Sequence, residues 1–240
     1  FTDFNALEVI PGVSVRYVRT VKELKNPDMI ILPGSKNTME DLLWMRQNGL
    51  EAAILKKAGE DKIIFGVCGG YQMLGETLSD PDGVEAGGTM KGMGLLPMDT
   101  VFKGAKTRTR VEGRFLEVTG ALSALSQIEL EGYEIHMGEC TRKENAKPLV
   151  TITDKVNGDS KADGTYKDNV YGSYVHGIFD KEEVAEAVVT SIGKKKGLDV
   201  SEMTGVDFAE YKEKQYDLLA DGLREYLDME KIYKILEEGI

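Results

Sequence analysis

The sequence has only two cysteines, two histidines and no apolar run long enough to cross a membrane. Two cysteines in a chain of 240 residues cannot form the disulfide framework of a small secreted domain, so we expect both thiols to be free. The chain begins at Phe1 without a methionine and shows no signal-like segment. We therefore expect a processed or excised piece of a protein that works in the cytoplasm.

Basic residues are also scarce relative to acidic ones, which gives a formal net charge of −11 and a pI of about 4.9. This balance argues against electrostatic binding to nucleic acid or to an anionic membrane. One local exception has alternating basic residues: Lys103, Lys106, Arg108, Arg110 and Arg114. We interpret it as a solvated strand face, and the alternative is a docking surface for an acidic partner or substrate.

Internal repeats, long linkers and a G-x-x-x-x-G-K-[ST] phosphate loop are all missing from the sequence. We therefore predict a single domain over residues 1–240 with a C-terminal helical extension, and we predict that this chain does not bind ATP. The hydrophobic share of 41% is enough to build a core.

The pattern of apolar residues in the first part of the chain alternates between strands and helices. Strands are predicted at Val13 to Val18, Met29 to Leu32 and Ile63 to Val67, and helices at Thr38 to Gln47 and Leu50 to Ala58. This order predicts an α/β fold with a parallel sheet covered by helices on both faces.

Later segments are shorter and separated by turns. We predict strands at Arg108 to Val118, Gly132 to His136, Leu149 to Thr153 and Val170 to Val175, with some antiparallel pairing, and an exposed turn from Asn157 to Asn169. Helices are predicted at Glu182 to Lys195 and, with amphipathic spacing, over Phe208 to Leu236.

Cys68 lies between glycines where the apolar strand Ile63 to Val67 has to turn into a helix. Small neighbours such as Gly66 and Gly70 let the backbone turn sharply and let the thiol project from the sheet, as in a nucleophile elbow. The amide groups at the start of the next helix favour a thiolate and can hold an oxyanion. Cys68 is therefore a candidate catalytic nucleophile.

Two other interpretations of Cys68 have to be weighed. A buried apolar cysteine at a strand end would not explain the glycines at 66, 69 and 70. A zinc site made of Cys68, Cys140, His136 and His176 lacks a C-x-x-C pair or a short ligand hairpin. We adopt neither.

The two histidines leave few candidates for a base that pairs with Cys68. His176 ends the strand Val170 to Val175 and is followed by Gly177, a position typical of catalytic residues at the carboxyl edge of an α/β sheet. His136 also lies at a predicted strand end. We choose His176, because a strand-end histidine far downstream of the cysteine fits the order that such sites require.

Several stretches together resemble the C-terminal class I glutamine amidotransferase (glutaminase) domain of the cobyric acid synthase type. They are Phe1 to Phe4, Ile31 to Thr38, Gly66 to Gln72, Tyr133 to His136, Tyr174 to Gly177 and Asp217 to Asp221. The resemblance covers nearly the whole chain. It implies a three-layer α/β sandwich with a mostly parallel, flavodoxin-like sheet and some antiparallel edge strands.

The resemblance also implies roles for individual residues. Cys68 attacks the amide carbon of glutamine and His176 transfers protons, while backbone amides near Gly34 and Gly69 face the oxyanion. Gln72 and His136 are expected to contact the substrate. The glutamate that usually follows the histidine by two residues is replaced by Ile178, so either a Cys–His dyad suffices or another group orients His176; the candidates are Asp180 and Glu134.

Partners follow from the same resemblance. L-glutamine is the implied substrate, and the ammonia passes to a synthetase domain of the same polypeptide that is absent from this chain. That domain is expected to bind the corrinoid, ATP and Mg²⁺, which leaves no metal or cofactor for this chain. The alternatives are the glutaminase of cobyrinic acid diamide synthase or of lipid II amidation, a cysteine hydrolase, and a catalytically silent regulatory domain.

Overall fold

The structure is a computed structural model that describes residues 2–201 and 203–239. It divides into two compact units, Phe1–Gly205 and Val206–Ile240. The helical segments of the first unit are η1 Thr2–Phe4, α1 Asn5–Glu8, α2 Val21–Leu24, α3 Thr38–Gln47, α4 Leu50–Gly59, α5 Gly69–Met73, η2 Gly120–Leu125 and α6 Glu182–Lys195. Its strands are β1 Met29–Leu32, β2 Ile63–Val67, β3 Thr77–Asp80, β4 Gly88–Lys91, β5 Met98–Phe115, β6 Glu129–Arg142, β7 Val150–Asp154, β8 Ser160–Asp163, β9 Thr165–Lys167 and β10 Val170–Ser173.

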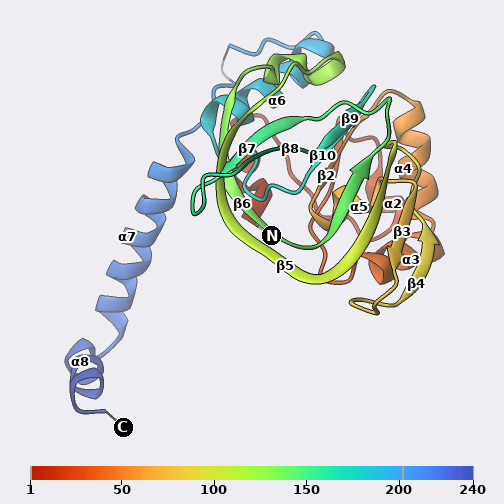
Figure 1. The fold of residues 1–240 in the computed structure, drawn as a ribbon. Helices are drawn as coiled ribbons and strands as arrows, with labels where there is room; N and C mark the ends of the chain where they lie inside the picture. Colours follow the sequence, from red (N-terminus) through yellow and green to blue (C-terminus); the bar gives the residue numbers. More distant parts are fainter. Residues whose placement is uncertain (1, 202, 240) are drawn as a thin grey trace. The chain divides into compact units, whose positions relative to one another are not determined.

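A four-stranded sheet has the order β1-β2-β10-β9. Strands β1, β2 and β10 are parallel, and β9 pairs antiparallel with β10. Helices α3 and α4 lie on one side of this sheet and α6 on the other (Figure 1). Every residue of β2 and β10 is buried, which explains why β2 has no polar side chain. The carboxyl ends of β2 and β10 lead directly to Cys68 and His176.

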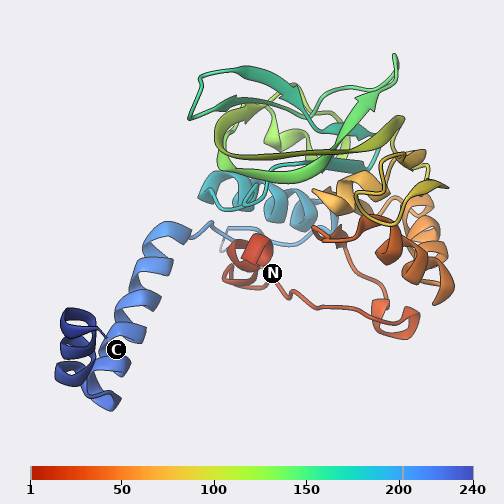
Figure 2. The same cartoon turned by 60° about the horizontal axis from the view of Figure 1, so that its bottom comes forward.

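A second sheet has the order β4-β3-β5-β7-β8, and β6 also pairs with β5. Most of its pairs are antiparallel. The long strand β5 changes register against β6 between Val101 and Lys106. Figure 2 shows β5 to β8, in yellow-green to teal, above α6. An antiparallel bridge between Tyr133 and His176 joins β6 to the residue that follows β10 by a short turn, so the two sheets meet at the site.

The α/β class and the parallel sheet between helices are confirmed. So are the bounds of β1, α3, β2 and α6, while α4 extends one residue further than predicted. The antiparallel strands are more extensive than the predicted edge strands, because they form a sheet of their own. The segment from Asn157 to Asn169, predicted as one turn, contains the short strands β8 and β9.

The prediction of a strand from Val13 to Val18 is wrong, because these described residues have irregular structure. The apolar pattern has a physical cause, because Val13, Val15 and Val18 pack against the core. A cavity of about 1070 Å³ is lined both by residues 12–19 and by β1. Packing toward the core therefore produced a short alternation at 13 and 15 without a strand ladder, and the alternation breaks at Tyr17, which is exposed.

The second unit contains α7 Phe208–Tyr226 and α8 Met229–Glu238. The predicted helical segment Phe208 to Leu236 is thus interrupted at Leu227 and Asp228. Asp228 begins the second helix, because its carboxylate accepts a hydrogen bond from the amide of Lys231 at 3.0 Å. Within the first helix, the rings of Phe208 and Tyr211 stack with their centroids 5.9 Å apart.

Two compositional expectations can be compared with the structure. Cys68 and Cys140 are both free thiols, as predicted. In the part of the chain that the structure describes, no helix combines the length and the apolar character that a membrane crossing requires.

Candidate active site

Cys68 has a backbone conformation that is unusual for a residue with a side chain. Its φ is 51° and its ψ is −111°, at the junction between β2 and α5. Its amide donates to the carbonyl oxygen of Ser173 at 2.9 Å, which ties the ends of β2 and β10 together. A non-glycine residue held at positive φ is strained, and such strain is concentrated at functional sites. The nucleophile elbow predicted from the sequence is present in the geometry.

The glycines around Cys68 permit close backbone contacts. A Cβ on Gly66 would lie 2.6 Å from the backbone of Tyr71, and one on Gly70 would lie 2.1 Å from the carbonyl oxygen of Leu32. A Cβ on Gly69 would lie 2.7 Å from the amide nitrogen of Ser35. These distances are far below van der Waals contact, so glycine is required for packing rather than for flexibility at these positions.

The loop after β1 passes directly over the cysteine and the histidine. A Cβ on Gly34 would lie 2.8 Å from Cε1 of His176 and 3.6 Å from Cβ of Cys68. The hydroxyl of Ser35 donates to Asp41 at 2.5 Å, and Asn37 caps α3 by accepting from the amide of Glu40. The loop is therefore anchored to α3, with Gly34 placed against both predicted catalytic residues.

His176 is held on three sides. Its Nδ1 lies 2.9 Å from Oδ2 of Asp3, and the ring of Tyr133 stacks on the imidazole with centroids 5.0 Å apart. His176 and Tyr133 also exchange both backbone hydrogen bonds, at 2.8 and 3.1 Å. The remaining side of the imidazole faces Cys68, since both side chains border Gly34, and the Cys68 thiol donates to the carbonyl of Ile135 at 3.6 Å.

Electrostatics favour the protonated form of His176. Burial alone would lower its pKa, but the hydrogen bonds and charges of Asp3 and Cys68 outweigh burial and raise the pKa to about 9. For Asp3, burial works to raise the pKa, yet the hydrogen bonds to His176 and Gly177 and the imidazolium charge hold it below its usual value. A raised pKa for His176 and a lowered pKa for Asp3 are what an ion pair between the two side chains at neutral pH requires.

Gln72 is only 2% exposed, so it is a buried residue of α5 and not a surface residue. Its Nε2 donates to the hydroxyl of Tyr174 at 3.1 Å, and its Oε1 accepts from the hydroxyl of Thr38 at 3.1 Å. The same Thr38 hydroxyl also lies 3.2 Å from Glu85. Gln72 thus links α5 to the start of α3 and to the strand end that carries His176.

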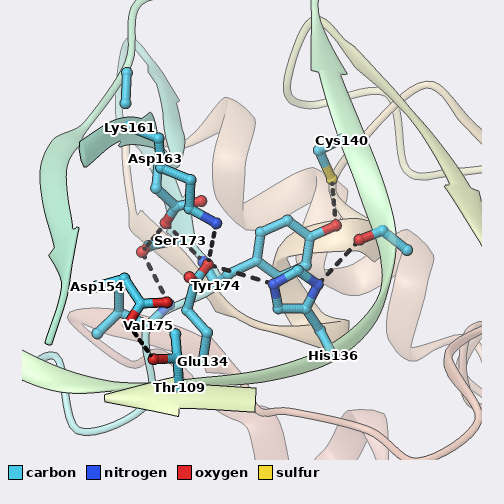
Figure 3. A network of polar contacts seen from close by, with 12 residues as sticks. Thr109, Glu134, His136, Cys140, Asp154, Lys161, Asp163, Ser173, Tyr174 and Val175 are labelled. Carbon is cyan, nitrogen blue, oxygen red and sulfur yellow. Dashed lines mark hydrogen bonds and ion pairs between the residues drawn. The ribbon is translucent and has the colours of Figure 1, made fainter. Parts of the chain in front are cut away.

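His136 belongs to a different polar network (Figure 3). Its Nε2 lies 3.3 Å from Glu134, which also accepts from Lys161 at 2.9 Å. Its Nδ1 donates to the carbonyl of Gly138 at 2.9 Å, and its ring stacks on Tyr174 with centroids 3.7 Å apart. Glu134, one of the two acids considered as an orienting group for His176, therefore pairs with the other histidine.

The same network contains the second cysteine. Sγ of Cys140 lies 3.1 Å from the hydroxyls of Thr100 and Tyr174, as the dashed line to Tyr174 in Figure 3 shows. Burial raises the pKa of the Cys140 thiol to about 12. Nearby, the buried Asp163 accepts from the hydroxyl of Ser173 and the amide of Tyr174. Cys140 is thus a protonated structural thiol.

The zinc alternative has no support in the geometry. Among residues 2–201 and 203–239, no group of three or more His, Cys, Asp and Glu side chains is placed to hold a metal ion. His136 and His176 are instead committed to separate carboxylate partners, Glu134 and Asp3.

The basic residues of the alternating stripe are all exposed. Lys106, Arg108 and Arg110 share one face of β5, and Lys103 forms an ion pair with Glu139 on β6. These positions fit a solvated strand face, and the alternative of a docking surface stays a prediction.

Sequence reasoning missed two residues of the site, Asp3 and Tyr133. Both lie in stretches that carried the family resemblance, Phe1 to Phe4 and Tyr133 to His136, although Phe1 itself lies outside the described residues. Ile178, at the usual position of the acid, is 0% exposed and packs in the core. Asp180 lies near Gly177, where its Oδ2 would be 3.3 Å from a Cβ on that glycine.

Comparison with known families gives one match that covers most of the chain. The model of the CobB/CobQ-like glutamine amidotransferase domain matches residues 1–184. Among curated proteins, the chain is 56% identical over 242 residues to a cobyric acid synthase of Ruminiclostridium cellulolyticum and 44% identical to one of Citrobacter koseri. The match covers 100% and 99% of this chain but 47% of each relative, so the chain spans about half the length of these relatives.

Solved structures support the fold. The chain resembles the structure titled PurLQS from Thermotoga maritima with a TM-score of 0.56 at 20% identity, covering 80% of this chain and 91% of that one. A crystal structure titled glutamine amidotransferase gives a TM-score of 0.51 at 17% identity, with coverage of 81% and 92%. At these identities the likeness concerns the fold alone.

Proposed function

We propose, since the chain belongs to the family of CobB/CobQ-like glutamine amidotransferase domains, that Cys68 attacks the side-chain amide carbon of L-glutamine. A tetrahedral intermediate then collapses to a glutamyl thioester on Cys68 and releases ammonia, and water hydrolyses the thioester to glutamate. The observation that carries this proposal is the position of Cys68, strained at positive φ and set with His176 against the same glycine, Gly34; the pKa of that histidine is raised to about 9.

His176 supplies the protons in this scheme. An imidazolium beside a cysteine can hold it as the thiolate of an ion pair, so that the nucleophile is charged before substrate arrives. The same imidazolium then protonates the leaving amine, and as neutral imidazole it accepts a proton from the attacking water. Asp3 on Nδ1 leaves Nε2 as the nitrogen available for these transfers.

The oxyanion would be stabilised by backbone amides around Gly34 and Gly69. Gly34 lies against Cys68 and His176, and Gly69 opens α5 against the Ser35 backbone. Each donor aimed at a developing oxyanion is typically worth about 2.7 to 4 kcal/mol. We assign Gln72 and His136 to the walls of the glutamine site, where both are fixed by partners of their own.

The ammonia would serve an amidation. The relatives at 56% and 44% identity are named cobyric acid synthase, which supports ATP-dependent amidation of corrinoid carboxylates to cobyric acid in cobalamin biosynthesis. We assign the corrinoid, ATP and Mg²⁺ to a synthetase domain of the same polypeptide, in the cytoplasm, because the chain spans 47% of those relatives.

A glutamine-like diazoketone tests the chemistry without depending on a partner domain. We expect the reagent to label Cys68 and to spare Cys140, whose pKa of about 12 keeps it protonated. Peptide mass spectrometry locates the label, and glutamate release from L-glutamine is measured alongside. Cys140→Ser should still be labelled, and Cys68→Ala should not. Labelling at Cys140 instead, or glutamate formation unchanged by Cys68→Ala, would refute the mechanism.

A further inference from the structure

Asp3 lies at the opposite end of the chain from the histidine that it contacts. It belongs to η1, Thr2–Phe4, and 173 positions separate it from His176. Its exposed fraction is 6%, which is low for a carboxylate, and buried carboxylates are retained where they are paired and hydrogen-bonded. Both oxygens have partners: Oδ2 lies 2.9 Å from Nδ1 of His176, and Oδ1 accepts from the amide of Gly177 at 3.0 Å.

The contacts of Asp3 with His176 and Gly177 fix the orientation of the imidazole as well as placing a charge beside it. Because the carboxylate is held by the backbone of Gly177, its plane is set relative to the chain that carries His176. The hydrogen bond to Nδ1 then sets the ring orientation and selects the tautomer with a proton on Nδ1. The stacked ring of Tyr133 restrains the imidazole from its face. The titratable groups around this imidazole are Asp3, Cys68, Tyr133 and, beyond Gly177, Asp180.

The usual position for an orienting acid is not available in this chain. Ile178 occupies it and is buried in the core. We propose that Asp3 is the positioning residue of His176 and completes a Cys68–His176–Asp3 triad, with its acid delivered by the N-terminal segment rather than by the strand end that carries the histidine. This proposal rests on the proposed function, since it assigns a role in the same reaction.

The segment that carries Asp3 is anchored in the fold. Phe4, Leu7 and Ile10 are buried in the core. Figure 2 shows the N-terminal turn in red beneath α6, and α1 contacts α6. The carboxylate is therefore held from both sides, by the packing of its own segment and by the amide of Gly177.

Titration of the two histidines tests the proposal without any activity assay. The chain has only two, so their ring carbon–proton signals can be followed by NMR and assigned with His136→Ala. We expect His176 to titrate near pH 9 in the unmodified chain. In Asp3→Asn its pKa should fall markedly, because the amide supplies one acceptor and no charge. Glu8→Gln, an exposed change in the same segment, should leave the titration unchanged.

Kinetics supply the second readout. Asp3→Asn should lower glutamate formation by about 10²-fold or more, mainly in kcat, and should shift the pH profile of diazoketone labelling at Cys68. Asp3→Glu should recover part of the activity, because the charge is kept at a changed distance. Thermal unfolding of each variant separates these effects from loss of the fold.

The outcomes separate this proposal from the proposed function. A chain that neither labels at Cys68 nor hydrolyses glutamine would refute the function, while the NMR titration would still show whether Asp3 controls His176. His176 titrating at or below 6.5 in the unmodified chain would overturn the triad. So would Asp3→Asn with an unchanged titration and an unchanged kcat.

Discussion

The two histidines have similar partners on one side of the imidazole ring but different neighbours on the other side. Each pairs with a buried carboxylate and stacks on a tyrosine: His176 with Asp3 and Tyr133, His136 with Glu134 and Tyr174. The two imidazoles differ in what the second ring nitrogen contacts. In His136 it donates to the carbonyl of Gly138, whereas in His176 the remaining side of the ring faces the thiol of Cys68.

The carboxylates differ in the same way. Glu134 also accepts from Lys161, so the charge around His136 is satisfied within the network. Asp3 also accepts from the backbone of Gly177, which orients it without neutralising it, so its charge acts on His176. Under the proposed mechanism, a carboxylate–histidine pair therefore serves structure at His136 and proton transfer at His176.

The largest expected effect comes from removing each imidazole in turn. His176→Ala should lower glutamate formation by about 10³-fold, because general acid–base catalysis is lost. His136→Ala should cost about tenfold or less, because that ring braces Tyr174 and β6. Steady-state kinetics with L-glutamine, at matched folded fractions, measures both. Equal losses of glutamate formation in the two variants would contradict the different roles assigned to the two histidines.

A change of pH should weaken the Asp3–His176 pair in a defined direction. The His176 pKa rises on folding from 6.5 to about 9, so its contribution is fully present below pH 6.5 and is lost as the pH rises through about 9. The Asp3 pKa is lowered from 3.8, so its contribution is present above pH 3.8 and is lost on acidification. By the size of the histidine shift, the alkaline loss is about 3 kcal/mol.

Urea unfolding measures this loss when the unmodified chain is compared with His176→Gln from pH 6 to pH 10. The difference between the two free energies of unfolding should shrink as the pH rises, since the substituted amide side chain cannot titrate. A difference that stays constant over this range would contradict the ion pair.

Local patterns made the elbow predictable, and long-range contacts made the acid unpredictable. Cys68 and its glycines form one continuous stretch whose backbone requirements can be inferred from residue types alone. Asp3 lies 173 positions from its partner, in a segment with no periodicity that points to it. Glu134 and His136 are two apart on β6 and so share one face of a strand. That spacing is a signal for their pairing, although the sequence left Glu134 as a candidate to orient His176.

Packing also explains where the secondary structure predicted from the sequence was wrong. Val13, Val15 and Val18 are apolar because they pack against the core, yet their segment makes no ladder with β1 in the described structure. The carboxyl end of β6 extends well past the predicted His136, to Arg142, because its pairing with β5 continues across a register shift. Neither feature is encoded in local propensity; both depend on which strand lies alongside.

The smallest expected effect lies in the structural network. Glu134→Gln removes the charge from the buried side chain whose Oε1 faces both Lys161 and His136, so we expect the free energy of unfolding to fall by about 2 kcal/mol. Glu139→Gln is the matched control on the same strand, because its carboxylate is 65% exposed and pairs with Lys103. That variant should change stability by less than about 0.5 kcal/mol. Chemical denaturation at pH 7 measures both.

The pH dependence of this effect follows from the pKa of Glu134. Burial alone would raise this pKa, but the hydrogen bonds and charges of His136 and Lys161 outweigh burial and lower it. Its stabilisation is present above the ordinary value of 4.5 and is lost as the pH falls through the lowered pKa, so the unmodified chain and Glu134→Gln should converge in acid. If Glu134→Gln instead kept its stability and lost glutamate formation as fully as His176→Ala, the His136 network would belong to the chemistry. The contrast between the two histidines would then be one of distance from Cys68 and not of role.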